Sequence, residues 1–344
     1  MDNITRWNLR VLEKALKTRR VVIVSGARQC GKSTLLEMFF DGKVEIRSLD
    51  SKRLREAALL DPQSFVRYDG NGPMVIDEVQ KAPELLSEIK LVVDRNRQPG
   101  QYVITGSSDI YSAPEADESL AGRVKNIRMR TFAQGEILGV EPKFLARLFA
   151  NDYDSLYPDC DKRTVLGLAF RGGYPEVVRL SPEDRREWFQ DYVKSLFSKD
   201  IKNDERIRRQ RALYDLLKAV SAWSSKFVDS AALQSACGLS RSTYREYLGV
   251  LERYYLCESV EAWTGSDYAR IGKRPKWYMC DTSLMAAMLN WRTKDIELDA
   301  DKSGKIVETL VFTELAAPWS FHLAVHFYPI PALHFAENFT ALPA

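Results

Sequence analysis

A glycine-rich run near the start of the chain has the residue types and the spacing that hold phosphate groups. Residues 26–34 read Gly-Ala-Arg-Gln-Cys-Gly-Lys-Ser-Thr, the Walker A pattern Gly-x4-Gly-Lys-Ser. Glycines let backbone N–H groups curl around phosphates, and a helix that begins here adds partial positive charge. We expect Lys32 to reach the β- and γ-phosphates and Ser33 to bind Mg²⁺. The full set of expected nucleotide contacts is Gly26, Ala27, Arg28, Gln29, Cys30, Gly31, Lys32, Ser33 and Thr34.

Two carboxylates end a second apolar run, in residues 72–78, as in a Walker B motif. Asp77 stands where the second Mg²⁺-organising carboxylate belongs. Glu78 stands where a hydrolytic enzyme has the base that polarises the attacking water, a group that a nucleotide kinase does not need. The alternative interpretation is a surface Asp-Glu pair that has no catalytic role.

Small hydroxyl side chains end a third apolar run, in residues 102–108. Parallel strands deliver their carboxyl ends to one ligand-binding edge, so we expect Thr105 or Ser107 to contact the γ-phosphate or the attacking water. Arg123 follows in the stretch Ser-Leu-Ala-Gly-Arg-Val at 119–124. Such an arginine stabilises charge on the transferring phosphoryl group, either as a sensor or as a finger offered to a neighbouring subunit. The alternatives are a Gly-Ser turn without a role and an ordinary surface arginine.

The elements that must position these residues alternate between apolar runs and amphipathic stretches. The pattern predicts helices from Leu35 to Phe40 and from Ala82 to Asp94. It predicts strands at 21–25, 44–49, 73–77, 102–106 and 126–131. The fold class is therefore α/β: a P-loop parallel sheet with helices on both faces, followed by a helical region and a winged-helix domain.

Length and composition set broad limits. A chain of 344 residues is expected to form two or three domains. The formal net charge is only +3, so any basic surface must be local. Five scattered cysteines without Cys-x-x-Cys spacing are typical of free thiols in a reducing cytosol. No signal-peptide pattern is present at the N-terminus, and we expect a cytoplasmic protein.

The second half of the chain is predicted to be mainly helical from Phe132 to Lys226. Residues 228–280 then have helix-turn-helix spacing, with caps at Asp229 or Ser230 and at Ser240. Two strand-like runs follow, around 256–263 and 277–280. Together these features predict a winged helix whose second helix buries one stripe: Tyr244, Leu248 and Leu251.

A cationic surface on this winged helix has two interpretations. Arg241 and Arg245 point outward on the second helix, and the basic wing holds Arg270, Lys273, Arg274 and Lys276. DNA is a possible partner through Arg241, Arg245, Lys273 and Arg274. Glu246 and Glu252 on the same helix weaken that interpretation, and the alternative is a lid or a protein-docking surface. The charged stretch at 185–211 is interpreted as a solvated helical face, and the alternative is a surface for nucleic acid or a partner.

These motifs resemble a prokaryotic family of AAA-superfamily ATPases that carry a C-terminal domain of unknown function. The stretches that carry the resemblance are 26–34, 75–80, 104–108, 119–124, 171–176 (Arg-Gly-Gly-Tyr-Pro-Glu) and 276–281 (Lys-Trp-Tyr-Met-Cys-Asp). The resemblance covers nine-tenths of the chain. It implies ATP and Mg²⁺ as cofactors, a functional Arg123, and adenine rather than guanine. No Asn-Lys-x-Asp motif for guanine is present in the sequence.

The C-terminal tail departs from the family pattern. Glu308 matches the first glutamate of a nuclease-like region, but the further metal-binding carboxylates and lysine are absent. No Lys or Arg follows Lys305, and all three histidines lie in this tail: His322, His326 and His334. This abrupt change suggests truncation or a frameshifted end. A metal at His322 and His326 is disfavoured for lack of a third ligand, and a membrane span at 315–336 is disfavoured by its prolines.

We therefore expect four regions: an AAA-type ATPase domain at 1–135, a helical linker or lid at 136–226, a winged-helix-like domain at 227–281 and a truncated domain at 282–344. The first hypothesis is an oligomeric ATPase whose hydrolysis moves the winged-helix region. The second is a slow nucleotide-gated switch that controls binding to DNA or to a protein. A nuclease is a distant third.

Overall fold

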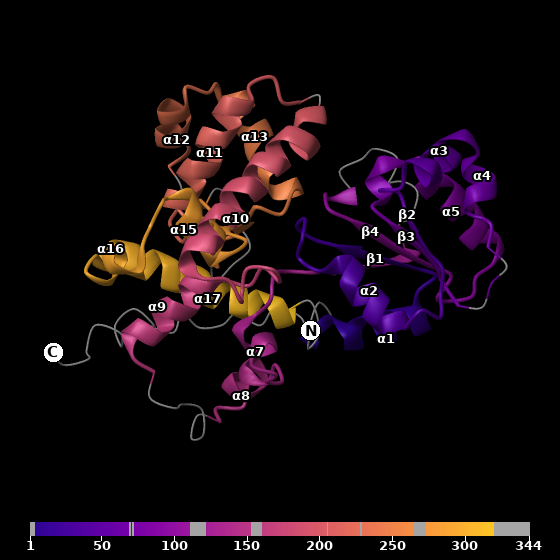
Figure 1. Ribbon diagram of the computed structural model, residues 1–344, viewed down its shortest axis with the longest axis horizontal. Helices are drawn as coiled ribbons and strands as arrows, with labels where there is room; N and C mark the ends of the chain where they lie inside the picture. Colours follow the sequence, from indigo (N-terminus) through magenta and orange to yellow (C-terminus); the bar gives the residue numbers. More distant parts are fainter. Residues whose placement is uncertain are drawn as a thin grey trace.

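A parallel sheet forms the first half of the molecule (Figure 1). The computed structural model describes residues 4–68, 70, 72–110, 122–152, 160–204, 206–227, 229–263 and 273–319. The strands of the sheet are β1 (Val21–Ser25), β2 (Ile46–Ser48), β3 (Met74–Asp77), β4 (Tyr102–Gly106) and β5 (Val124–Arg128), in the spatial order β2-β3-β4-β1-β5. Every adjacent pair is parallel, so the carboxyl ends of all these strands lie at one edge. β4 lies between β1 and β3 and brings its end between theirs.

Helices cover both faces of this sheet, which confirms the predicted α/β class with a parallel sheet between two helical layers (Figure 1). The covering helices are α1 (Asn8–Thr18) and α2 (Lys32–Phe40) on one face and α3 (Lys52–Leu60), α4 (Pro62–Phe65) and α5 (Leu85–Arg95) on the other. Successive strand residues point to opposite faces. Val22 and Val24 therefore pack with α1 and α2, while Val21 and Ile23 pack against the α3–α5 layer.

Pairing with β1 decides where the edge strand β5 begins. Val21 pairs with Val124 and Ser25 pairs with Arg128, so β5 starts two residues before the predicted 126–131 segment and ends three residues before its end. β2 is shorter than the predicted 44–49 strand because only Ile46–Ser48 pairs with β3. The predicted bounds of β2 and β5 were wrong because a strand extends only as far as its neighbour pairs with it. A hydrophobic run in the sequence does not show where that pairing ends.

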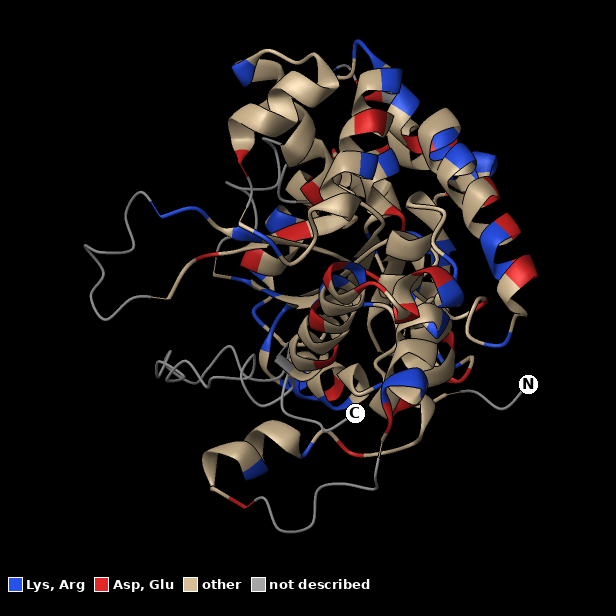
Figure 2. Cartoon of the chain, turned by 90° about the vertical axis from the view of Figure 1, so that its left-hand side faces the viewer, with Lys and Arg blue, Asp and Glu red and all other residues tan. Residues whose placement is uncertain are grey.

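The second half of the chain is mainly helical, as predicted. Its helices are α7 (Gln134–Ile137), α8 (Phe144–Phe149), α9 (Lys162–Arg171), α10 (Pro182–Ser195), α11 (Gln210–Ala222), α12 (Ser230–Cys237), α13 (Arg241–Arg253), α15 (Thr282–Met288), α16 (Thr293–Glu297) and α17 (Ala300–Trp319). A π-helical turn η3 (Leu196–Asp200) and a 3-10 turn η4 (Ile201–Asn203) continue α10. In the view of Figure 2, Lys and Arg residues (blue) alternate with Asp and Glu residues (red) along the helices.

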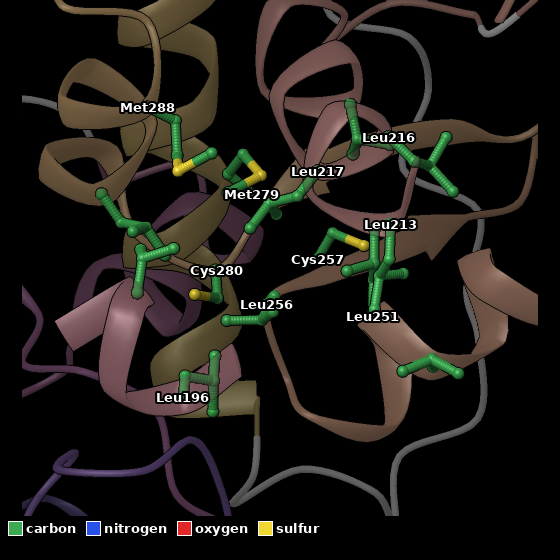
Figure 3. Packing of buried hydrophobic residues seen from close by; sticks show 14 of the residues in the cluster. Leu196, Leu213, Leu216, Leu217, Leu251, Leu256, Cys257, Met279, Cys280 and Met288 are labelled. Carbon is green, nitrogen blue, oxygen red and sulfur yellow. The ribbon is translucent and has the colours of Figure 1, made fainter. Parts of the chain in front are cut away.

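One hydrophobic cluster unites most of this half (Figure 3). Its buried residues run from Tyr174 to Met288 and come from α10, α11, α12, α13, α15 and the strands β6 (Cys257–Val260) and β7 (Lys276–Met279). A second cluster joins α9 to α15, α16 and α17. The division at 226/227 and 281/282 stays a prediction, although buried residues of one core lie on both sides of both positions.

The segment predicted as a winged helix contains two capped helices and an antiparallel strand pair. Asp229 accepts hydrogen bonds from the backbone of α12, Ser240 caps α13, and Gly238 between them has φ +58°. β6 pairs antiparallel with β7. The buried stripe predicted for α13 is confirmed: Tyr244, Leu248 and Leu251. The assignment as a winged helix stays a prediction, and Arg270 of the predicted wing lies outside the described residues.

Among the residues that the structure describes, no helix is long and apolar enough to cross a bilayer. The three tail histidines and most of the 315–336 segment lie outside those residues.

Candidate nucleotide-binding site

The glycine-rich loop joins β1 to α2 at the carboxyl edge of the sheet. Gly26 is required by a close approach, because a Cβ atom here would lie 2.1 Å from the carbonyl oxygen of Met129. Gly31, at the N-cap of α2, has φ +97°, a conformation that side chains other than glycine rarely adopt. Gln29 also has a positive φ, +60°. Cys30 and Ala27 are buried, whereas Ser33 and Thr34 are exposed at the start of α2. The loop therefore has the tight curvature that lets backbone N–H groups surround a phosphate.

Lys32 turns back onto the loop. Its ammonium donates hydrogen bonds to the carbonyl oxygens of Gly26 (3.1 Å) and Ala27 (3.0 Å), and only 5% of the residue is exposed. These carbonyl contacts hold a buried cation where the loop curls around its centre. A phosphate oxygen there would offer the ammonium a charged acceptor in place of neutral ones.

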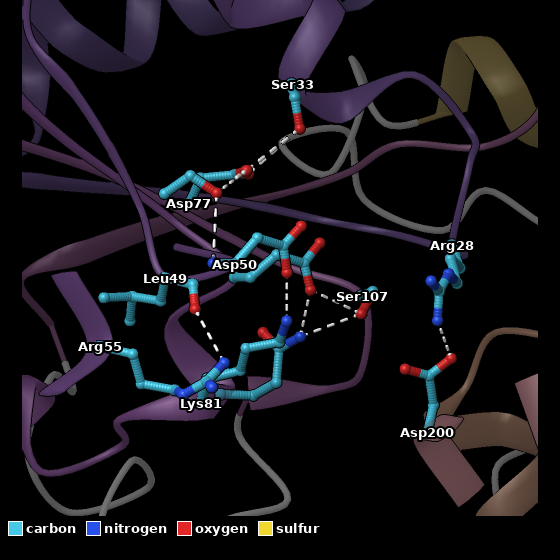
Figure 4. A network of polar contacts seen from close by, with 12 residues as sticks. Arg28, Ser33, Leu49, Asp50, Arg55, Asp77, Lys81, Ser107 and Asp200 are labelled. Atoms are coloured by element: carbon cyan, nitrogen blue, oxygen red, sulfur yellow. Dashed lines mark hydrogen bonds and ion pairs between the residues drawn. The ribbon is translucent and has the colours of Figure 1, made fainter. Parts of the chain in front are cut away.

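Asp77 is the centre of a polar network at the end of β3 (Figure 4). Ser33 donates to its two carboxylate oxygens at 3.2 and 3.3 Å, and Ser48 donates at 3.2 Å from the end of β2. Thr105, fully buried at the end of β4, donates to the same carboxylate. The structure thus brings together Ser33, Asp77 and Thr105 as the sequence predicted. Ser48 was missed because it ends a short strand that carries no motif.

The donor set around Asp77 fits Mg²⁺. Hydroxyl and carboxylate oxygens are the ligands that this ion prefers, in an octahedron with bonds of about 2.1 Å. Neighbouring corners of such an octahedron are about 3.0 Å apart. Ser33 Oγ and Asp77 Oδ1 are separated by 3.2 Å. The two oxygens therefore already stand close to the spacing that shared coordination requires.

Glu78 is held by two side chains that lie beyond the Walker B motif itself. Ser107 donates to Glu78 Oε2 at 2.8 Å, and the amide of Gln80 donates to the same oxygen and to Ser107 Oγ at 2.9 Å. The backbone N–H of Glu78 donates to Thr105 Oγ1 at 3.0 Å. Glu78 has φ +60°, which turns the chain from β3 into the 3-10 turn η1 (Val79–Lys81). Sequence reasoning missed Gln80, although its position two residues after Glu78 could have indicated it.

Arg123 lies apart from these groups. It precedes β5, and its carbonyl oxygen accepts from the N–H of Val21 at the start of β1. It is therefore at the opposite edge of the sheet from the loop. Its guanidinium pairs with Asp94, whose pKa is lowered chiefly by this hydrogen bond. The structure does not bring Arg123 to the phosphate-binding loop of its own chain, and a contact to a neighbouring subunit stays a prediction.

The phosphate-binding loop also touches the helical half of the molecule. The Arg28 guanidinium forms an ion pair with Asp200 at the end of η3 (Figure 4). The Tyr192 hydroxyl on α10 donates to the Arg28 carbonyl oxygen at 3.3 Å, and burial raises the pKa of Tyr192 well above its ordinary value. Pro175 lies 3.5 Å from where a Cβ on Gly31 would stand. Loop and helical half are thus in direct contact.

Glu308, the predicted remnant of a nuclease site, has a structural partner. It accepts hydrogen bonds of 2.8 Å from Lys276 and from Tyr278. Within the described ranges, no group of three or more His, Cys, Asp or Glu residues could hold a metal. The nuclease-like remnant has no support from these contacts.

Comparisons with known proteins agree with this architecture. Residues 18–138 match the family model described as an AAA domain, and residues 163–295 match a domain of unknown function, DUF8612. Residues 18–138 are thus similar to an AAA domain, and the parallel sheet with the loop between β1 and α2 has the arrangement of a P-loop nucleotide-binding fold. The fold is similar to that of the Walker-type ATPase PABY2304 of Pyrococcus abyssi, with a TM-score of 0.50 and 14% sequence identity. The likeness covers 83% of this chain and 96% of that one.

Two curated relatives have similar sequences. The uncharacterized proteins Mb2031c of Mycobacterium bovis and Rv2008c of Mycobacterium tuberculosis are each 27% identical to this chain over 314 residues. These matches cover 89% of this chain and 64% of each relative, so the chain spans less than two thirds of the relatives' length.

Proposed function

We propose that this chain is a Mg²⁺-dependent ATPase whose hydrolysis cycle moves its C-terminal helical half against the sheet domain. The observation that carries this proposal is the contact of Arg28, inside the phosphate-binding loop, with Asp200 of the helical half. ATP rather than GTP is proposed from the AAA-domain match and from the absence of a guanine-specific motif in the sequence.

Each group at the carboxyl edge has a role in this reaction. Lys32 exchanges its carbonyl partners for the β- and γ-phosphates, and Ser33 with Asp77 holds Mg²⁺. When bound, the ion neutralises charge on the phosphate oxygens. Glu78 accepts a proton from the attacking water, and Thr105 orients Asp77 and the Glu78 backbone. Ser107 and Gln80 hold the Glu78 carboxylate.

The coupling follows from the position of Arg28. Nucleotide in the loop places anionic phosphates near a guanidinium that is paired with Asp200 and whose carbonyl accepts from Tyr192. Phosphates compete with a carboxylate for the same cation. Occupancy of the loop therefore weakens the Arg28–Asp200 pair and releases η3, a π-helical turn of the kind often found at functional sites.

Arg123 serves a neighbouring subunit in this proposal. Arg123 lies at the opposite edge of the sheet from the loop of its own chain. It can therefore reach a phosphate only on a nucleotide bound by another chain. Catalysis would then depend on assembly. An Arg123→Ala chain mixed with a Glu78→Gln chain should recover part of the turnover, because mixed assemblies contain sites with a wild-type glutamate and a wild-type arginine.

The alternative is a slow switch that holds ATP and turns over rarely. Steady-state ATP hydrolysis over a range of protein concentrations, with Glu78→Gln as the control, separates the two. Turnover per chain that rises with concentration and disappears in Glu78→Gln supports the ATPase. Tight ATP binding without turnover at every concentration would instead support the switch.

A further inference from the structure

A pocket of about 330 Å³ lies between α12 and α13, away from the nucleotide site. Its lining residues are Asp229, Ser230, Ala231, Gln234, Arg241, Tyr244, Arg245 and Arg274. Arg241 and Arg245 are one turn apart at the start of α13, and Arg274 comes from the segment that leads into β7. Three arginine residues from two separate segments therefore line one hollow.

These arginines are available to a ligand. All three are exposed, and in the described part of the chain none has an ion-pair or hydrogen-bond partner. The single carboxylate in the lining belongs to Asp229, which accepts from the backbone N–H groups of Ala231 (3.0 Å) and Ala232 (3.4 Å). The lining therefore carries an excess of two positive charges.

The chemistry of the lining selects a phosphodiester over an acidic protein segment. A guanidinium presents a planar fork of donors that matches two phosphate oxygens, and Ser230, Gln234 and Tyr244 offer further hydroxyl or amide groups. Protein partners usually require apolar anchors that become fully desolvated. Here Ala231 and the ring of Tyr244 are the apolar parts of the lining, and Tyr244 is already buried in the core.

We propose that this pocket binds the sugar–phosphate backbone of duplex DNA, with Arg241, Arg245 and Arg274 on neighbouring phosphates. The proposal names a partner for the C-terminal half that we propose moves with ATP hydrolysis. Glu246, exposed on the same helix, repels a closer approach along α13. The site therefore recognises backbone charge and depends little on base sequence.

The test is fluorescence anisotropy with a labelled DNA duplex over a salt series, without nucleotide. The variant Arg241→Ala/Arg245→Ala/Arg274→Ala should reduce the slope of log affinity against log salt by between two and three, at about 0.9 per phosphate contact. The matched control Arg53→Ala/Arg163→Ala removes two exposed arginines from α3 and α9 and should leave the slope within about one of wild type. The triple lysine variant should keep most of the slope but bind more weakly, since lysine lacks the planar fork.

A clearly larger loss of slope in the triple alanine variant than in the control supports the proposal, and a loss in the control that equals or exceeds it overturns the proposal. Competition arms use RNA of the same sequence, inorganic phosphate and poly-glutamate. Displacement of the duplex by poly-glutamate at equal charge concentration would assign the pocket to acidic proteins instead. Thermal unfolding checks the fold of each variant. Because DNA binding is measured without ATP, the binding result can be interpreted even if the chain hydrolyses no ATP, and ATP hydrolysis can be interpreted even if no DNA is bound.

Discussion

The backbone N–H of Gly173 donates a hydrogen bond of 2.8 Å to the Asp281 carboxylate, across 108 residues of sequence. Asp281 is buried and also accepts from the N–H groups of Ser283 (2.9 Å) and Leu284 (3.1 Å), which caps α15. One carboxylate therefore ties the start of α15 to the Gly-Gly-Tyr-Pro-Glu stretch. Pro175 of that stretch lies beside Gly31 of the phosphate-binding loop. Two stretches that carry the family resemblance, 171–176 and 276–281, thus meet next to the candidate nucleotide site.

Asp281→Ala should lower the free energy of unfolding by about 3 kcal/mol, because it leaves several buried N–H groups without an acceptor. Asp281→Asn keeps one acceptor oxygen and should cost roughly half as much. Urea denaturation of the full chain measures both. Asp229→Ala, which removes a half-buried cap from α12, is the control and should cost about 1 kcal/mol. An equal loss for Asp281→Ala and Asp229→Ala would contradict the role of Asp281 as a tie between segments.

Gln80→Leu should reduce kcat by about tenfold while ATP affinity stays within about twofold of wild type. The change keeps the size of the side chain but removes the amide that holds the Glu78 carboxylate, and a loosely oriented base transfers protons less efficiently. Steady-state kinetics, direct nucleotide binding and thermal unfolding separate orientation from folding. Gln63→Leu on α4, an exposed position, is the matched control. A parallel rise in KM and fall in unfolding temperature would indicate a structural role only.

Asp200→Ala should uncouple nucleotide binding from the helical half. In the wild type we expect ATP to change the rate of limited proteolysis of η3 and the segment after it, because phosphates compete for Arg28. In the variant that pair is already absent, so the ATP-dependent difference should disappear while ATP affinity changes by less than about threefold. Asp191→Ala, at an exposed position on α10, should behave as wild type. A full ATP response in Asp200→Ala would remove Arg28–Asp200 from the mechanism.

Glu314 predicts a pH dependence of stability. Burial raises its pKa from the ordinary value near 4.5 to about 7, although backbone N–H groups of Gln134 and Gly135 oppose this shift. A folded-state pKa above the unfolded one means that ionisation favours unfolding. Stability should therefore fall as pH rises from about 4.5 to about 7, by at most roughly 3 kcal/mol. Urea midpoints across this range measure the slope, and Glu314→Gln should flatten it. An unchanged slope in that variant would assign the pH dependence to other groups.

The local parts of the candidate site could be predicted from the sequence. Gly26, Gly31, Lys32 and Ser33 lie within one turn and one helix start, so their spacing alone specifies a phosphate-binding geometry. Asp77 and Thr105 could be placed beside them because each ends an apolar run, and parallel strands end at one edge. The N-terminal caps of α12 and α13 could also be predicted, since a capping side chain bonds only to the backbone of the next three residues.

What remained depended on tertiary contacts. The start of β5 is set by its pairing with β1, and the opposite-edge position of Arg123 follows from that register. Ser48 acquires a role because β2 pairs with β3, which ends in Asp77. Gln80 acquires one because β4 brings Ser107 within hydrogen-bond distance of it. Spacing along a chain constrains residues within a few positions. The Arg28–Asp200 ion pair joins segments 172 residues apart. It depends on how the sheet packs against the helical half, and no local sequence pattern encodes that packing.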